Sequence, residues 1–344
     1  MQHHVHIVNP IEYPGWDELL TSSQRCNFFH TSVWAKVLCE TYHYRPVYFT
    51  LLDGNRLLAL VPMMEVKSIF TGLRGVCLPF TDHCEFIRDN SPQAEDIINF
   101  IKDYAREHRW QFIELRCGNY PNQTPSTSFY GHILDLTVGD ERLFRRFADS
   151  VRTNIRKAIR VGVEVSIDKS IDGVREYYRL HCITRKRHCL PPQPFRFFKK
   201  TYDHIISKGL GFVALARYRG TNVAGAMFFN FGEKSIFKFG ASDYAYQDLR
   251  GNNLVMWEAI KWHTQHRYRS LCFGRTEVDN EGLRRFKIGW GTQERILNYY
   301  RYDLQRDAFV TGDRLATSAS HRIFRAMPIP LLRLCGSVLY KHIG

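Results

Sequence analysis

The sequence predicts an α+β protein built from two similar halves, and three observations lead to this fold class. The chain has 344 residues, of which 44% are hydrophobic and 14% aromatic, enough for two domains with packed cores. Each half holds two β-rich runs around a turn signal, then a helical pattern and a short strand. This order recurs after roughly 160–166 residues, which favours an internal duplication; chance recurrence of common α+β units is the alternative.

The first half begins with a predicted hairpin. Residues 46–52 and 56–66 are strand-like, and Asp53-Gly54-Asn55 between them is a turn signal. Apolar residues recur at helical spacing over 92–108, and 111–116 predicts a short strand.

The second half repeats these elements. We expect a hairpin over 211–218 and 223–231, a strand over 235–240, a helix over 253–266 and a short strand over 269–273.

The connection between the halves predicts one long helix over 140–162, with an apolar stripe and a face rich in arginine and lysine. We therefore expect an N-terminal domain over residues 1–139, a C-terminal domain over 140–305 and a basic amphipathic tail over 306–344.

The chain is strongly basic, with 48 Lys+Arg against 34 Asp+Glu and a formal net charge of +14. Basic residues cluster over 142–160, 185–200 and 318–344, and the last two segments contain no acid. This clustering indicates an anionic partner such as a nucleic acid, a nucleotide sugar, an acyl carrier or a membrane surface. An ordinary basic surface is the alternative.

Several classes of protein are not expected. No window is long and apolar enough for a transmembrane helix, and the first residues lack the pattern of a secretory signal. Nine cysteines without a regular framework fit the reduced thiols of a cytoplasmic protein.

Common catalytic motifs are missing too. The sequence has no P-loop and no G-x-S-x-G, and the letters G-x-G-x-x-A at 209–214 precede a strand instead of linking a strand to a helix. His181-Cys182 and His188-Cys189 would lie about 10 Å apart along a helix, too far to share one zinc. We expect no metal and no tightly bound cofactor.

The segment 238–291 is the most promising place for chemistry. A strand is followed by a polar loop and a helix start at Arg250, Gly251, Asn252 and Asn253, where backbone N–H groups and the helix dipole favour an anion. A second strand end leads into Arg275, Glu277, Asp279, Phe286 and Lys287. Mixed charge, amide and glycine after strand ends are typical of functional loops; an exposed loop with a capped helix is the alternative.

At these residues the chain resembles the Fem (FemABX) aminoacyltransferases, and more closely the FemAB-like proteins of bacterial envelope-polysaccharide systems. The matching segments are 239–242, 252–260, 273–274 and 286–291, with looser support at 29–36 and 154–163. The resemblance implies two tandem acetyltransferase-like (GNAT) domains. It also implies transfer of an amino acid from aminoacyl-tRNA to an amine of a peptidoglycan precursor peptide.

The resemblance further implies roles for single residues. Lys287 matches the active-site lysine of the family's F-K-x-G-[FW]-G segment, and Asp82 is similar in placement to a catalytic-site aspartate. Trp34 and Lys36 match a segment that helps hold the sugar-nucleotide peptide, and Arg185 with Tyr202 resembles a pair that contacts the acceptor.

The chemistry requires a neutral amine, a positioned carbonyl and a stabilised oxyanion. Lys287 would supply positive charge, and Asp82, Glu277 or Asp279 would accept the amine proton. Lysine in the segment 286–290 has no evident packing role, so we expect that removing it leaves the fold intact.

The acyl donor stays open between aminoacyl-tRNA and acyl-CoA. The long helical arm that several Fem enzymes use for tRNA contact is missing, because 171–208 predicts only two ordinary helices. Three function classes follow: a FemAB-type transferase acting on an envelope precursor, an acyl-CoA-dependent N-acyltransferase of exopolysaccharide biosynthesis, and a non-catalytic protein that binds anions or membranes.

The tail over 318–344 predicts two short amphipathic pieces divided by Pro328 and Pro330, too short and too charged to span a bilayer. Such a segment either lies on an anionic membrane surface or folds back on the C-terminal domain. We therefore expect a cytoplasmic protein with peripheral membrane contact as one possibility for its tail.

Overall fold

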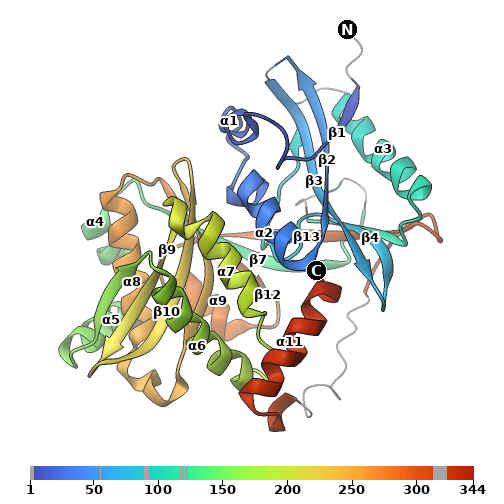
Figure 1. Ribbon diagram of the computed structural model, residues 1–344. Coiled ribbons are helices and arrows are strands. Elements are labelled where there is room, and N and C mark those ends of the chain that lie inside the picture. The colour runs from blue at the N-terminus through green and yellow to red at the C-terminus, as the bar shows by residue number, and fades with distance from the viewer. Residues whose placement is uncertain (1–3, 55, 89–92, 117–119, 121–122, 313–323) are drawn as a thin grey trace. The chain divides into compact units, whose positions relative to one another are not determined.

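The computed structural model describes residues 4–54, 56–88, 93–116, 120, 123–312 and 324–344, and the chain divides into two compact units (Figure 1). Unit 1 holds the described residues of Met1–Phe129, Ile296–Arg314 and Leu339–Gly344. Unit 2 holds those of Tyr130–Arg295 and Leu315–Val338.

Unit 1 is a mostly antiparallel sheet with helices. Its strand order is β1-β2-β3-β4-β6-β13, in which only the β4–β6 pair is parallel among the described residues. The elements before β7 are β1 (Val5–Val8), α1 (Trp16–Thr21), η1 (Phe28–His30), α2 (Ser32–Tyr42), β2 (Arg45–Asp53), β3 (Arg56–Ser68), β4 (Gly72–Val76), β5 (Ile87–Arg88), α3 (Gln93–Glu107) and β6 (Phe112–Leu115).

The core of unit 1 forms where α3 covers the sheet. Ile97, Ile98 and Ile101 of α3, at the helical spacing seen in the sequence, are buried against Phe49 of β2 and Tyr300 of β13 (Gln293–Asp303). Strand β14 (Ala308–Val310) pairs with β13. The predicted hairpin and helix of the first half are confirmed to within a few residues.

Unit 2 repeats this pattern in the order β12-β11-β10-β9-β8, with β11–β12 parallel and the other pairs antiparallel. Strand β7 (Thr127–Asp135) begins in unit 1 and continues into unit 2. The elements that follow are α4 (Asp140–Arg146), α5 (Asp149–Arg160), β8 (Glu164–Asp168), α6 (Ile171–Arg187), α7 (Phe195–His204), η2 (Ile206–Lys208), β9 (Gly211–Tyr218), β10 (Thr221–Phe231), β11 (Lys234–Ser242), η3 (Tyr244–Leu249), α8 (Gly251–Gln265), β12 (Ser270–Glu277) and α9 (Glu281–Ile288).

The β9–β10 hairpin shows why the sequence folds this way locally. Tyr218 pairs with Thr221 across a two-residue turn. Arg219 and Gly220 in that turn have φ of 47° and 82°. Positive φ at both central positions matches the twist of the strands it joins.

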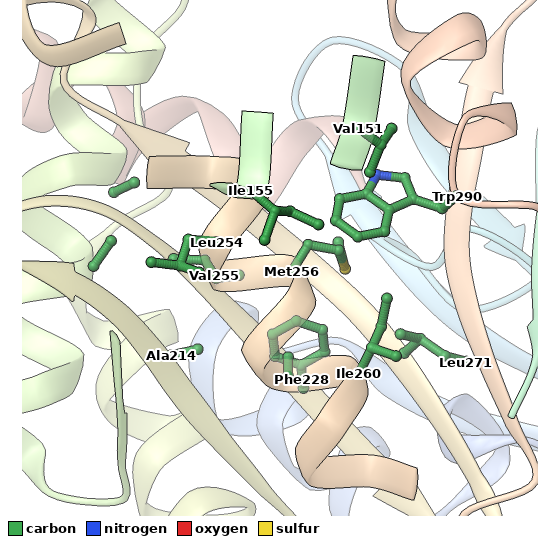
Figure 2. Close-up of a cluster of buried hydrophobic side chains, with 14 of the residues drawn as sticks. Val151, Ile155, Ala214, Phe228, Leu254, Val255, Met256, Ile260, Leu271 and Trp290 are labelled. Atoms are coloured by element: carbon green, nitrogen blue, oxygen red, sulfur yellow. The ribbon is translucent and has the colours of Figure 1, made fainter. Parts of the chain in front are cut away.

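Strands β9 and β10 of unit 2 are buried on both faces because helices cover both. Phe212, Ala214 and Ala216 of β9 belong to the cluster that also holds α5 and α8, whereas Val213 and Leu215 point to the other face, where α6 packs. Figure 2 shows the cluster, with Met256 and Ile260 of α8 among Phe228, Leu271 and Trp290. The β11–α8–β12 arrangement fixes the edge at which the candidate site lies.

The duplication is visible in the order of elements within each unit. In unit 1, β2, β3 and β4 are followed by α3 and by the parallel strand β6. In unit 2, β9, β10 and β11 are followed by α8 and by the parallel strand β12.

The helix predicted over 140–162 is instead two helices. Phe147, between α4 and α5, is extended with ψ 147°. Its ring is buried against Trp257 and Trp290, and the next backbone N–H, of Ala148, donates to Gly289 O at 2.9 Å. These tertiary contacts interrupt the helix at a point where the sequence pattern is continuous.

The compact units follow a different division from the predicted boundaries at 139/140 and 305/306. Residues of β13 pair with β6 through Tyr300–Leu115 and Asp303–Phe112, so the described residues of Ile296–Arg314 join unit 1. A pairing between strands that are so distant in sequence has no local signal.

The described part of the tail is divided at Pro328, as predicted. Residues 324–326 are helical, residues 327 and 328 interrupt the helix, and α11 (Ile329–Ile343) follows. Pro330 does not divide the tail, because it occupies the first turn of α11, where a proline removes no helical hydrogen bond. Residues 318–323 of the predicted tail lie outside the described residues. Within the described ranges, no helix has the length and apolar character needed to cross a membrane.

Candidate functional site

The candidate site lies where two parallel strands of unit 2 end. The pairs between β11 and β12 run from Lys234–Ser270 to Ile236–Cys272, and both strands continue beyond them, to Ser242 and Glu277. Because the carboxyl ends of parallel strands lie at one edge of a sheet, the loops that lead into α8 and α9 share that edge. The segment 238–291 singled out in the sequence forms this edge.

The start of α8 follows β11 and the short helix η3. Arg250 has a left-handed backbone with φ 59° and is the N-cap of α8. Asn252 donates from Nδ2 to Ser242 Oγ at 3.1 Å, and Asn253 is buried. The first turn of α8 contains no acid, so its N–H groups and dipole favour an anionic ligand.

Gly251 has a packing role at this helix start. A Cβ at this position would lie 3.3 Å from Ala224 Cβ and 3.4 Å from Ala216 Cβ, on β10 and β9. The glycine therefore lets α8 approach the sheet closely.

Lys287 occupies the edge at the end of β12. It lies on α9, is 3% exposed, and donates from Nζ to Gly274 O at 3.2 Å and to Arg275 O at 2.8 Å. Both acceptors are backbone carbonyls of β12, so the ammonium is fixed beside the carboxyl end of that strand. The expectation that this lysine has no packing role was wrong, since it satisfies two carbonyls.

The other predicted residues of this segment precede Lys287 in the chain. Glu277 ends β12 and Asp279 lies in the turn before α9, both exposed. Arg275 is half-buried and contributes the carbonyl just described. Phe286 is half-buried, with its ring 6.0 Å from that of the buried Trp290. Phe286 therefore also anchors α9 on the core.

Three further side chains of unit 2 form a network beside Lys287 that the sequence did not indicate. His132 of β7 is fully buried and lies 3.0 Å, Nε2 to Oε2, from Glu294 of β13. Arg284 of α9 donates to both oxygens of the same carboxylate at 2.8 Å, and its guanidinium lies 4.0 Å from the centre of the Tyr130 ring. Arg284 and Lys287 are three residues apart on one helix, so this network fixes the helix that bears Lys287.

The electrostatics of the network favour a neutral histidine and an ionised carboxylate. Burial and the charge of Lys287 lower the pKa of His132, although Glu294 opposes them. Hydrogen bonds from Arg284 lower the pKa of Glu294. His132 and Glu294 are 162 residues apart, which explains why no sequence pattern linked them; only Arg284 lay within the segment already singled out.

Asp82 belongs to unit 1, in a loop with unusual backbone geometry. Leu78 and Phe80 have φ of 46° and 59°, a region that non-glycine residues enter at a cost of about 1–2 kcal/mol each. Arg116 holds the loop by donating to Leu78 O at 2.9 Å and Thr81 O at 3.2 Å. Tyr299 donates from its hydroxyl to Asp82 O at 2.7 Å. These contacts fix the backbone of the loop, and Arg116 and Tyr299 had no signal in the sequence.

Trp34 and Lys36 lie on α2 of unit 1. Trp34 is fully buried, with its ring 5.3 Å from that of Phe29, and thus contributes to the core. Lys36 is half-buried.

Arg185 and Tyr202 lie on α6 and α7 of unit 2. Arg185 donates from Nε to Pro191 O at 3.2 Å and so supports the connection between these helices. Tyr202 is half-buried, with Lys199 Nζ 5.8 Å from its ring centre. The expected two helices over 171–208 are present.

This edge combines the fixed positive charge of Lys287 with two exposed carboxylates, Glu277 at the end of β12 and Asp279 in the turn before α9. Among the described residues, no group of three or more His, Cys, Asp or Glu side chains is arranged to hold a metal ion.

Comparison with known proteins agrees with the fold. Residues 145–291 match the family described as "Acetyltransferase (GNAT) domain". No curated protein matches the sequence significantly.

Solved structures of similar fold cover nearly the whole chain. A structure of FemX has a TM-score of 0.70 at 15% identity, covering 89% of this chain and 98% of that one. L-PGS from Bacillus licheniformis has a TM-score of 0.54 at 13% identity, covering 91% and 96%. A tandem GNAT protein from the clavulanic acid biosynthesis pathway has a TM-score of 0.54 at 9% identity, covering 88% and 99%. The chain therefore has the predicted α+β fold of two tandem GNAT-type domains, and the match to an acetyltransferase (GNAT) domain covers residues 145–291.

Proposed function

We propose that the protein transfers an aminoacyl or acyl group to an amine of a cell-envelope precursor, either a peptidoglycan peptide or a polysaccharide. The observation that carries the proposal is the position of Lys287, whose ammonium is buried at the carboxyl end of β12, the strand that ends at Glu277. The likeness in fold to FemX and to L-PGS supports an envelope component as the acceptor.

The reaction is a direct acyl transfer. The neutral amine of the acceptor attacks the carbonyl carbon of the donor, a C–N bond forms, and the bond to the ribose oxygen or thiol sulfur breaks. Lys287 supplies positive charge for the developing oxyanion or the leaving group. The amine proton passes to a carboxylate, directly or through water, for which Glu277, Asp279 and Asp82 are the candidates. Arg275 and Phe286 line the same corner and would contact the substrate.

The anionic donor would bind at the start of α8. The N-terminus of that helix, with Arg250, Gly251, Asn252 and Asn253, suits a phosphate group of either tRNA or CoA. Lys36, Arg185 and Tyr202 are proposed to contact the acceptor, on the resemblance described above. The fully buried Trp34 would instead support α2, the helix that bears Lys36.

An acyl-CoA donor is the second candidate, and one observation favours it. Residues 171–208 contain α6, α7 and η2, and all of them are compact elements of unit 2 with no extended arm. The acceptor would then be an amine of an exopolysaccharide precursor.

Mass spectrometry of envelope and exopolysaccharide precursors from a deletion strain tests the function. In the deletion strain, we expect one precursor to lack the mass of the transferred group. Complementation with the Lys287→Met variant should leave this group missing, whereas complementation with Lys261→Met should restore it. Unchanged precursors in the deletion strain would contradict the proposal. Isothermal titration of the purified chain with CoA thioesters and with aminoacyl-tRNA then identifies the donor.

We place this activity in the cytoplasm. The eight cysteines of the described ranges form no disulfide bond, which fits a reducing compartment.

A further inference from the structure

Helix α11 presents an exposed apolar strip on unit 2. Leu331, Leu334 and Val338 are 50%, 62% and 53% exposed, and their spacing of three and four residues places them on one face of the helix. Aliphatic side chains so exposed at successive helical positions mark a surface that contacts another apolar phase.

The opposite side of α11 packs against unit 2, so the strip faces away from these contacts. Leu332 is fully buried, and a Cβ on Gly336 would lie 1.9 Å from Pro192 O. The helix backbone therefore rests directly against the α6–α7 connection, and α11 cannot turn its apolar strip inward without losing this contact.

Two grooves rich in arginine adjoin the strip. One of about 450 Å³ is lined by Arg196, Arg333, Leu334 and Ser337 among others, and one of about 370 Å³ by Arg175, Arg179 and Arg333. Arg333 lies over the Tyr178 ring at 5.3 Å and lines both grooves.

The charge balance of this surface is positive. Arg175 and Arg179 are paired with Asp172 and Glu176, whereas no acid occurs anywhere in 318–344. Arg196 is exposed, and Arg325 and Arg333 of the tail are exposed as well.

We infer that this face, the strip of Leu331, Leu334 and Val338 with Arg196 and Arg333, docks the protein on an anionic lipid bilayer. Aliphatic side chains enter the boundary between headgroups and acyl chains, and guanidinium groups bind lipid phosphates beside them. An RNA surface would need the arginines but not the aliphatic strip. The inference does not depend on the proposed transfer reaction, because docking needs neither donor nor acceptor.

Flotation of the full chain with phospholipid vesicles tests the inference. We expect it to float with vesicles containing phosphatidylglycerol and to stay behind with pure phosphatidylcholine, with binding reduced by rising salt. Leu334→Asp combined with Val338→Asp should reduce the floated fraction at least tenfold. Both positions are exposed, so thermal melting should match the wild type.

The matched control is Ile159→Asp, which changes an equally exposed aliphatic residue on the basic helix α5 of the same unit. It should float like the wild type, and Arg196→Gln with Arg333→Gln should lose binding to the anionic vesicles. The inference would be overturned if the wild type bound neutral and anionic vesicles equally or did not float at all. It would also be overturned if Ile159→Asp reduced flotation as much as the Leu334–Val338 variant. So would a shift of bulk tRNA that disappears in the arginine variant and persists in the Leu334–Val338 variant.

Discussion

Lys287 has a structural role in the fold and, in the proposed function, a chemical role as well. Its Nζ satisfies the carbonyls of Gly274 and Arg275 and at the same time places a positive charge at the strand end. The sequence motif around such a residue indicates its chemistry but not its burial. Its structural role therefore cannot be predicted from sequence.

Replacing Lys287 by Met should therefore abolish transfer and also lower the free energy of unfolding by about 1–3 kcal/mol, since two buried carbonyls lose their donor. Urea unfolding measures the second effect. Lys261→Met is the control, because that lysine forms a partly exposed ion pair with Glu258 at 2.7 Å and should cost less than about 1 kcal/mol. An unchanged stability of the Lys287 variant would show that the carbonyls find other partners.

Glu294 acts through its neighbours, as a positioning residue for α9. Glu294→Gln keeps the size of the side chain but weakens the bidentate contact with Arg284, so we expect turnover to fall about tenfold with binding of the donor little changed. Steady-state kinetics separates the effect on turnover from the effect on donor binding. Glu281→Gln breaks an exposed pair with Arg285 on the same helix and should keep wild-type kinetics; a similar loss in both variants would argue against the network.

His181 makes stability depend on pH. Burial lowers its pKa to about 3, beneath the ordinary 6.5, so the unfolded chain binds a proton that the folded chain excludes. The free energy of unfolding should thus decrease as the pH falls from 7 to 5, by up to about 2 kcal/mol for this group.

His181→Phe should flatten this pH dependence, because the ring already lies among Tyr177, Tyr178 and Phe198. Urea unfolding at pH 7 and pH 5 measures it. Phe198→Leu, which loosens the same packing without a titrating group, should lower stability at both pH values and leave the slope unchanged. If the free energy of unfolding of His181→Phe changed with pH as much as that of the wild type, other titratable groups would dominate the pH dependence.

Individual elements were predictable where the local pattern and the tertiary context agree. Strand β9 was predicted at its observed bounds, and α3 and α8 to within two residues, because their apolar spacing matches the faces they bury. The break between α4 and α5 was not predictable, since it depends on the contacts of Phe147 with two distant tryptophans.

The contact between α8 and its sheet leads to a prediction at this scale. Gly251→Val should lower stability and weaken donor binding, because the added atoms meet Ala216 and Ala224 at the start of the helix. Gly282→Ala on α9, where the nearest atom to a Cβ is 4.0 Å away, should instead raise the free energy of unfolding by about 0.4–1 kcal/mol. Urea unfolding and calorimetric titration measure both. A Gly251→Val variant with the same free energy of unfolding as the wild type would refute the packing role of Gly251.

For the whole molecule, the duplication was predictable and the assembly of each unit was not. Both halves show hairpin, helix and strand in the sequence, and each unit contains the corresponding antiparallel strands, helix and parallel strand. Pairings such as β6 with β13, and contacts such as His132 with Glu294, join segments far apart along the chain, so only the folded structure brings them together.

The make-up of unit 1 has a consequence for how the protein is made on the ribosome. The buried cluster of unit 2 that holds α5 and α8 lies within residues 134–290, whereas the core of unit 1 also needs Tyr300 and Tyr302. The half that is synthesised first must therefore wait until β13 has been synthesised to complete its sheet. A nascent chain stalled with residues up to 295 outside the exit tunnel should resist limited proteolysis over 134–290 and be cut readily before residue 129, and release of the next segment should protect both.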